Sequence, residues 1–245
     1  MADLEEKLRR IPLISPQRMV IGGALVLLAI ALPVAAYFRP AAPVPAVTEF
    51  DRQAGAMEYL SEIGFGVEYG SAAPVLHKWT KDVRIKVHGS PTEVDRQTIE
   101  QVVAELNTMV GEINLELVDE AANLEVYFSP ESQFSEIEPT YVPTNLGFFR
   151  VWFDAEGGIQ QGRVLIAADV TTQAERIHLI REELTQSLGL FKDSWAYSDS
   201  IFYEGWTTTD KYGPLDEATI RLLYQPQLEP GMNRSQVRSL YLPTD

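Results

Sequence analysis

The most informative stretch of the chain is "HLIREELTQSLGLFKD", residues His178–Asp193, where an apolar helical period carries a row of polar side chains. At about 100° per residue, one face of this helix is apolar and should pack on a sheet; it carries Ile177, Ile180, Leu184 and Leu188. On another face, His178, Glu182 and Gln186 follow one another at four-residue spacing and form a single row. Such a row is most often a solvated surface, so periodicity alone does not separate a surface from a site.

The ends of this helix and the elements before it indicate the fold class. Thr172 and Glu175 have the spacing of a capping box, and Gly189 is a typical helix terminator. Upstream, the pattern predicts a strand at 82–89, a helix from Ser90 with its own capping box at Glu93, and two further strands near 115 and 124. A hairpin over 148–169 and a helix at 216–224 complete the order. We therefore expect an α+β domain, with a mixed, mostly antiparallel sheet and two main helices.

The N-terminal part predicts a membrane anchor. Residues 19–38, "MVIGGALVLLAIALPVAAYF", hold no charged side chain, and a helix of this length spans about 30 Å, the thickness of a hydrocarbon core. More basic residues precede the span than follow it closely, which predicts a cytoplasmic segment 1–18 and a C-terminal domain outside the cytoplasm. We expect a single-pass protein of a bacterial cytoplasmic membrane, with a periplasmic domain. A cleaved signal peptide is the alternative.

The remaining chain divides by composition. Residues 39–48 form a Pro/Ala-rich linker that favours an extended conformation. A helical extension is expected at 49–78, followed by the extracytoplasmic domain at 79–245. We expect His77 and His88 at the surface or at strand ends.

Charge and cysteine content exclude several classes of function. The formal net charge is -15 and the chain has no cysteine. An acidic surface repels phosphate backbones, so we predict no nucleic-acid partner. Without cysteine there is no disulfide, no thiolate zinc site and no cysteine nucleophile.

The segment "EELTQSLGLFK" resembles the H-E-x-x-H-x-x-G-x-x-H pattern of the metzincin metallopeptidases, especially the matrixin-like ones. In this alignment Glu183 matches the general-base glutamate and Gly189 the glycine, while the three histidine positions hold Glu182, Gln186 and Lys192. Further on, "YSDSIFYEG" resembles the methionine-containing turn of that family, with Phe202 in place of the methionine. The resemblance covers residues 79–224 and implies a metzincin-like fold. The whole pattern also resembles an uncharacterised family of bacterial domains of unknown function.

The departures from the metzincin pattern argue against zinc chemistry. Catalytic zinc is normally held by three protein ligands, at least two of them imidazoles, and here every histidine position is replaced. An ammonium group at Lys192 would repel a cation beside it. We therefore expect no metal and no cofactor, and a pseudoenzyme whose former substrate cleft acts as a peptide- or protein-binding or scaffolding module. This cleft would include His178, Glu182, Gln186, Lys192 and Phe202, and the strand "FFRVWFDA" would accept an extended peptide.

An active hydrolase is the alternative function. Glu183 would then be catalytic together with Glu182, using either an unusual oxygen-liganded metal or no metal. In either case the resemblance implies that Lys192 returns to the helix near the two glutamates. Its charge would there relieve the repulsion between their carboxylates.

Overall fold

The computed structural model describes residues 49–65 and 74–241, all of which belong to one compact unit that spans 46–245. The predicted segments 1–18, 19–38 and 39–48 lie outside the described residues. In the described part, no helix combines the length and the apolar character that crossing a membrane requires.

Six strands form one sheet in the order β3-β2-β4-β6-β1, with β5 paired to β6 on its own. Their bounds are β1 Lys78–Trp79, β2 Val83–Gly89, β3 Leu115–Leu117, β4 Leu124–Ser129, β5 Gly147–Phe153 and β6 Gly158–Ala167. Every pairing is parallel except that of β5 with β6, in which Gly147 faces Ile166 and Phe153 faces Ile159. The predicted hairpin is therefore confirmed.

The expected mostly antiparallel sheet is wrong, because the sheet is mostly parallel. The reason lies in the connections between β2, β4 and β6. Between β2 and β4 the chain runs back along α2, and between β4 and β6 it runs back along β5. The strands β2, β4 and β6 can therefore all begin at the same end of the sheet. Such crossovers produce parallel neighbours.

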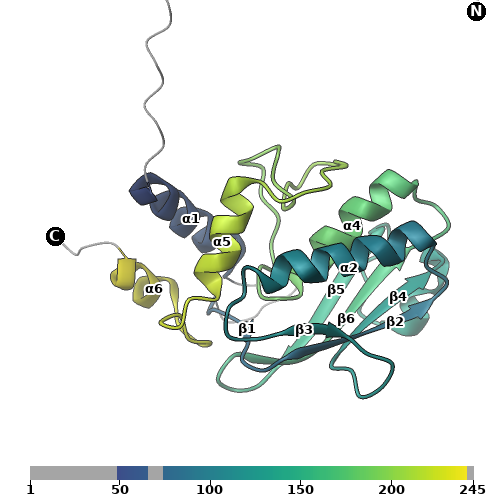
Figure 1. The fold of residues 1–245 in the computed structure, drawn as a ribbon, viewed down its shortest axis with the longest axis horizontal. Helices are drawn as coiled ribbons and strands as arrows, with labels where there is room; N and C mark the ends of the chain where they lie inside the picture. Colours follow the sequence, from purple (N-terminus) through teal and green to yellow (C-terminus); the bar gives the residue numbers. More distant parts are fainter. Residues whose placement is uncertain (1–48, 66–73, 242–245) are drawn as a thin grey trace, which may run out of the picture. The chain divides into compact units, whose positions relative to one another are not determined.

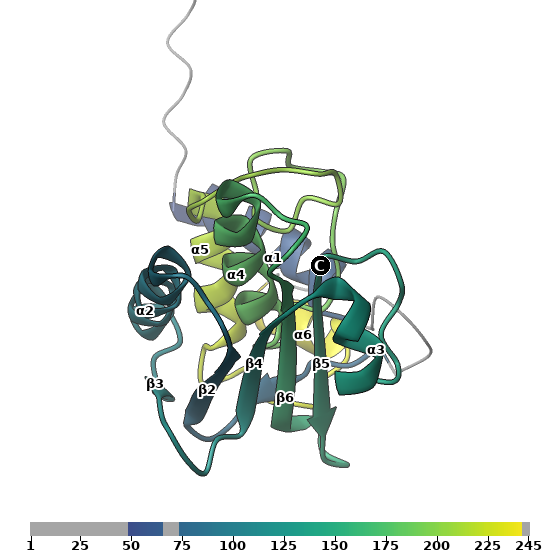
Figure 2. The same cartoon turned by 90° about the vertical axis from the view of Figure 1, so that its right-hand side faces the viewer.

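The helices of the sheet region lie mainly on one face, where α2 (Glu93–Asn107) and α4 (Gln173–Gln186) run side by side (Figures 1 and 2). The 3-10 turn η3 (Glu131–Gln133) and α3 (Phe134–Ile137) follow β4. Three helices lie beyond β1 in Figure 1: α1 (Glu49–Ile63), α5 (Pro214–Leu223) and α6 (Arg234–Tyr241). The apolar core thus fills the space between the sheet and α2 and α4, and continues between α1 and α5.

Helix α4 begins as the sequence predicts, whereas α2 does not. Thr172 caps α4, and its side chain and that of Glu175 form both hydrogen bonds of a capping box. The capping box of α2 joins Thr92 to Asp95, in place of the predicted Ser90 and Glu93. The observed start, two residues later, coincides with a tertiary contact, since Asp95 also receives hydrogen bonds from α4.

A buried ion pair fastens the first turn of α2 to that of α4. The Arg176 Nε atom lies 3.2 Å from Asp95 Oδ1, and the Gln173 amide donates to the same oxygen at 2.6 Å. Only 1% of the Asp95 side chain is exposed. Burial alone would raise the pKa of Asp95, but hydrogen bonds from Gln173 and Thr92 and the Arg176 charge hold that pKa below its ordinary value. The pair therefore stabilises the charged form of a carboxylate inside the fold.

Helix α1 is integrated into the compact unit through a buried hydrogen-bonded chain. The Tyr59 hydroxyl donates to Ser200 Oγ (2.8 Å), because the Ser200 hydroxyl itself donates to Asp216 Oδ1 (2.6 Å). The carbonyl of Ile63 accepts a hydrogen bond from the Lys192 backbone N–H at 3.1 Å. Helix α1 thus contacts both α5 and the segment that follows α4.

Candidate functional site

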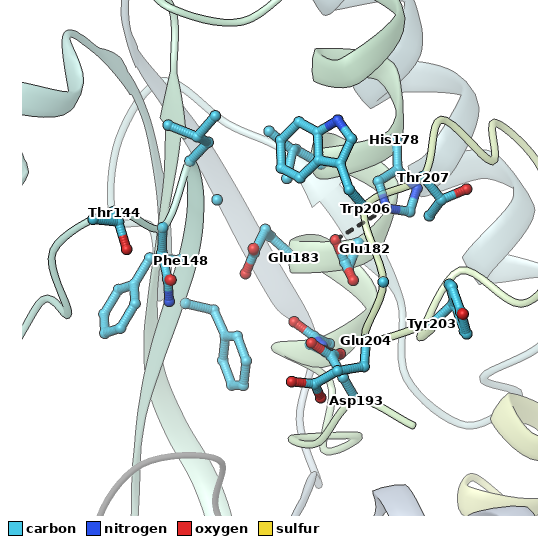
Figure 3. Close-up of a pocket in the computed structure, with 17 residues that line it drawn as sticks. Thr144, Phe148, His178, Glu182, Glu183, Asp193, Tyr203, Glu204, Trp206 and Thr207 are labelled. Atoms are coloured by element: carbon cyan, nitrogen blue, oxygen red, sulfur yellow. Dashed lines mark hydrogen bonds and ion pairs between the residues drawn. The ribbon is translucent and has the colours of Figure 1, made fainter. Parts of the chain in front are cut away.

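A cavity of about 260 Å³ lies over α4, between the start of β5 and the chain that follows α4 (Figure 3). Residues 144–149 form one side and residues 203–207 the other. The floor is α4 together with Asp193; the α4 residues that line it are His178, Leu179, Glu182, Glu183 and Gln186. Four of the predicted site residues therefore meet in one cavity.

The polar row of α4 is buried, so its interpretation as a solvated surface is wrong. His178, Glu182 and Gln186 are 5%, 8% and 3% exposed. The sheet covers one side of the helix, and residues of the irregular segment 194–213 cover another, as the bond from His178 to Thr209 shows. A buried row of this kind needs partners for its polar atoms.

His178 has a partner at each ring nitrogen. Its Nδ1 lies 2.8 Å from the Thr209 carbonyl oxygen, and its Nε2 lies 3.3 Å from Glu182 Oε2. Burial alone would lower the pKa of His178. The hydrogen bond and charge of Glu182, with a smaller contribution from Thr209, raise that pKa above its ordinary value. These surroundings therefore stabilise the imidazolium form, which donates from both nitrogens, more than water does for an ordinary histidine.

Glu183 and Gln186 are held by neighbours on other segments. Glu183 is buried against β5, where a Cβ atom added at Gly147 would overlap its Oε1, so any larger residue at this position would require the Glu183 side chain to move. The Gln186 amide donates to Asp193 Oδ1 at 2.5 Å. Both polar side chains thus lie buried against neighbouring segments on the floor of the cavity.

The cavity is strongly acidic. Among its lining residues, His178 is the single basic one. Four carboxylates line it: Glu182, Glu183, Asp193 and Glu204. Aromatic side chains complete the lining, with Phe148 and Phe149 from β5 and Tyr203 and Trp206 from the far side. Such a lining favours a cationic group over an anionic one.

Lys192 and Phe202 do not line this cavity. Helix α4 ends at Gln186, and the turn that follows it includes Gly189, whose φ of +125° directs the chain away from the cavity. The Lys192 backbone N–H then donates to the Ile63 carbonyl of α1, and the Lys192 side chain is half-buried. Asp193 lines the cavity in its place. Phe202 is fully buried, and its ring meets that of Tyr59 edge to face at 6.2 Å between centroids.

The other two histidines lie at strand ends, as expected, although His77 is buried. Its ring is 4.0 Å from the Phe153 ring and 5.6 Å from that of Phe191, measured between centroids. Burial lowers the pKa of His77 below its ordinary value. His88 is half-buried at the end of β2 and pairs with Glu125.

The residues in the metzincin-like positions do not fit a zinc ion. Glu182 and Gln186 offer oxygen and amide groups that face His178 and Asp193, and Lys192 lies outside the cavity lining. In residues 49–65 and 74–241, no cluster of three or more His, Asp or Glu side chains is arranged to hold a metal ion. No step of a reaction is therefore assigned to zinc.

Fold and site together define an α+β domain with a mostly parallel sheet and an acidic cavity on its second main helix. The chain belongs to the family described as "Protein of unknown function (DUF2927)", whose model matches residues 53–243. No curated protein matches the chain in sequence.

Two solved structures of myroilysin are weakly similar to the chain. The first, "Structure of Myroilysin", has a TM-score of 0.38 and 13% identity, over 61% of this chain and 82% of that one. The second, "Crystal structure of myroilysin", has a TM-score of 0.29 and 14% identity, over 54% of this chain and 60% of that one.

Proposed function

We propose that the domain binds an extended peptide or protein segment in the cavity on α4 and along the edge of β5. The observation that carries this proposal is the position of an edge strand beside the cavity. Among the described strands β5 pairs with β6 alone, and its first three residues line the cavity. The other edge of β5 can accept an added strand through its backbone groups, while the cavity receives a side chain of the ligand.

The lining of the cavity favours a lysine or arginine side chain in the bound segment. Its four carboxylates attract a cation, and Trp206, which is 63% exposed, offers an aromatic face beside them. Tryptophan and tyrosine side chains commonly provide much of the binding energy at interfaces, and aromatic faces also attract cations. We accordingly assign a binding or scaffolding role that needs no zinc-dependent proteolysis.

Hydrolysis of the bound segment is the second candidate function. It is favoured by one observation, the presence of Glu182 and Glu183 side by side on the floor of the cavity. A buried carboxylate within reach of a bound ligand can act as a general base. The binding experiment that follows also tests this candidate.

Three capped pentapeptides, identical except for a central lysine, norleucine or glutamate, provide the test. The lysine peptide should bind at least about tenfold more tightly than the glutamate peptide, since the cavity attracts one charge and repels the other. Binding is followed by tryptophan fluorescence, with Trp206→Phe identifying the signal from the cavity. Glu204→Gln should weaken binding of the lysine peptide and leave that of the norleucine peptide unchanged.

Equal affinities for the three peptides, or no binding of any, would contradict the proposed ligand class. Mass spectrometry of the same mixtures measures cleavage. A cut lysine peptide, with the cut abolished in Glu183→Gln, would establish the hydrolase and overturn the purely binding role.

We further propose that residues 19–38 anchor the protein in a bacterial cytoplasmic membrane, with the domain outside the cytoplasm. A reporter that is active only outside the cytoplasm, fused after Asp245, should be active, and a cytoplasm-only reporter at the same place should be silent. The uneven distribution of basic residues around the span is the reason. The reverse reporter pattern would contradict this orientation. The mass of the mature chain separates a retained anchor from a cleaved signal peptide.

A further inference from the structure

The far side of the cavity belongs to a segment that is fastened to α4 at several points. We name residues 203–212 the wall segment. The Trp206 indole N–H donates to Glu175 Oε1 at 3.2 Å, and the Thr209 carbonyl oxygen lies 2.8 Å from His178 Nδ1. At its end, the Tyr212 hydroxyl is 2.7 Å from Thr185 Oγ1. The middle contact is the one that involves a group able to titrate near neutral pH.

We propose that His178 is a pH-dependent latch, whose imidazolium form holds the wall segment against α4 by joining the Thr209 carbonyl to the Glu182 carboxylate. Loss of one ring proton leaves an N–H group for only one of these two acceptors and so weakens the hold of α4 on the wall segment, while the contacts of Trp206 and Tyr212 remain. The latch regulates the site to which the proposed function assigns ligand binding, and its importance for binding rests on that function.

The two partners of His178 make the latch depend on its protonation state. A backbone carbonyl and a carboxylate oxygen are both acceptors, so each requires an N–H group on the ring. The imidazolium has two such groups and the neutral ring has one. After deprotonation, one acceptor therefore faces a nitrogen lone pair at a buried position, which is unfavourable.

The charged groups around His178 determine the direction of the pH effect. On its own helix Glu182 favours the imidazolium, while Arg181 opposes it. The other charged side chains of the cavity are Glu183, Asp193 and Glu204, and residues 144–149 contribute none. The raised pKa of His178 means that the stabilisation of the closed wall is complete below the ordinary histidine pKa. It is lost as the pH rises through the raised value.

Hydrogen exchange of the full-length chain in detergent, from about pH 6 to about pH 9, measures the latch directly. Protection factors, corrected for the intrinsic effect of pH on exchange, should fall about tenfold in the wall segment over this range, because one charge-assisted hydrogen bond is lost. Protection of α2 should stay constant. The pKa of His77 is shifted below the ordinary histidine value, in the opposite direction from that of His178. The two titrations can therefore be told apart.

Two variants give the comparison its controls. His178→Gln carries no titrating ring and should show protection of the wall segment that does not change with pH. His88→Gln removes another histidine that pairs with a glutamate, Glu125, on the sheet. This matched variant should retain the full pH dependence of the wild type.

Wild-type protection that is independent of pH, or an identical transition in His178→Gln, would overturn the latch. Should His178→Gln not fold, NMR titration of the wild-type ring decides, and a pKa below the ordinary histidine value would refute the proposal. The exchange measurement needs no ligand. A transition without binding of any peptide would support the latch and refute the proposed function, whereas peptide binding with flat exchange would do the reverse.

Discussion

Arg176→Met should lower the free energy of unfolding by about 3 to 5 kcal/mol, because it leaves a buried carboxylate without its charged partner. Asp95 would keep its hydrogen bonds from Gln173 and Thr92, but these do not neutralise its charge. Urea unfolding, followed by circular dichroism, measures the loss. The difference from wild type should narrow in acid. Because the folded pKa of Asp95 is lowered, the stability it contributes is present above its ordinary pKa and disappears as the pH falls.

An exposed ion pair of the same kind serves as the matched control. Arg84 Nε lies 3.6 Å from Glu116 Oε1, with side chains that are 43% and 51% exposed. Arg84→Met should therefore change the free energy of unfolding by at most about 1 kcal/mol. If Arg176→Met and Arg84→Met lowered the free energy of unfolding by similar amounts, burial would not be the reason for the contribution of the Arg176–Asp95 pair to stability.

Gly189→Ala should destabilise the domain by about 3 kcal/mol or more. The φ of Gly189 is +125°, which side-chain-bearing residues rarely adopt, and an added Cβ would overlap the carbonyl oxygen of His77. The two nearest atoms, the carbonyl oxygen and carbon of His77, belong to the backbone, so they cannot move aside as a side chain does. Thermal unfolding of the wild type and the variant at the same pH measures this loss of stability as a lower Tm.

Gly111→Ala is the control for the glycine prediction. Gly111 also has a positive φ, +66°, but an added Cβ there would meet no atom within 4 Å. This value lies in the left-handed region, where an alanine costs about 1 to 2 kcal/mol. The additional loss at Gly189 measures the overlap and the rarer backbone conformation together. Equal losses would mean that the backbone around His77 relaxes without strain.

Local chemistry in the sequence predicts the ends of α4 and the β5–β6 hairpin correctly. Thr172 and Gly189 act through atoms within a few residues, so their effect is visible in the sequence. The direction of the strands was predicted wrongly because pairing joins residues far apart in the chain. The predicted start of α2 differs from the observed one at a similar long-range contact, since Asp95, the partner of the N-cap residue Thr92, also receives a hydrogen bond from Arg176.

The candidate site was predictable on α4 and not beyond it. His178, Glu182, Glu183 and Gln186 meet in one cavity because helical spacing fixes their relative positions. Asp193, Glu204 and Trp206 also line it but stand on irregular segments, where no period in the sequence indicates which way a side chain points. The position of Lys192 depends on the turn at Gly189, which carries it to α1.

Helix α1 is synthesised long before the residues that cover it in the folded domain. Tyr59 and Ser200 are separated by 141 positions, and α1 packs on α5, which begins at Pro214. At about 5 to 20 residues per second, the ribosome needs roughly eight to thirty seconds to supply these partners after α1 has emerged. Met57, Leu60 and Ile63, which are buried in the finished fold, have no cover from α5 in the meantime. Chains that terminate before α5 retain this exposed apolar face and are therefore expected to aggregate.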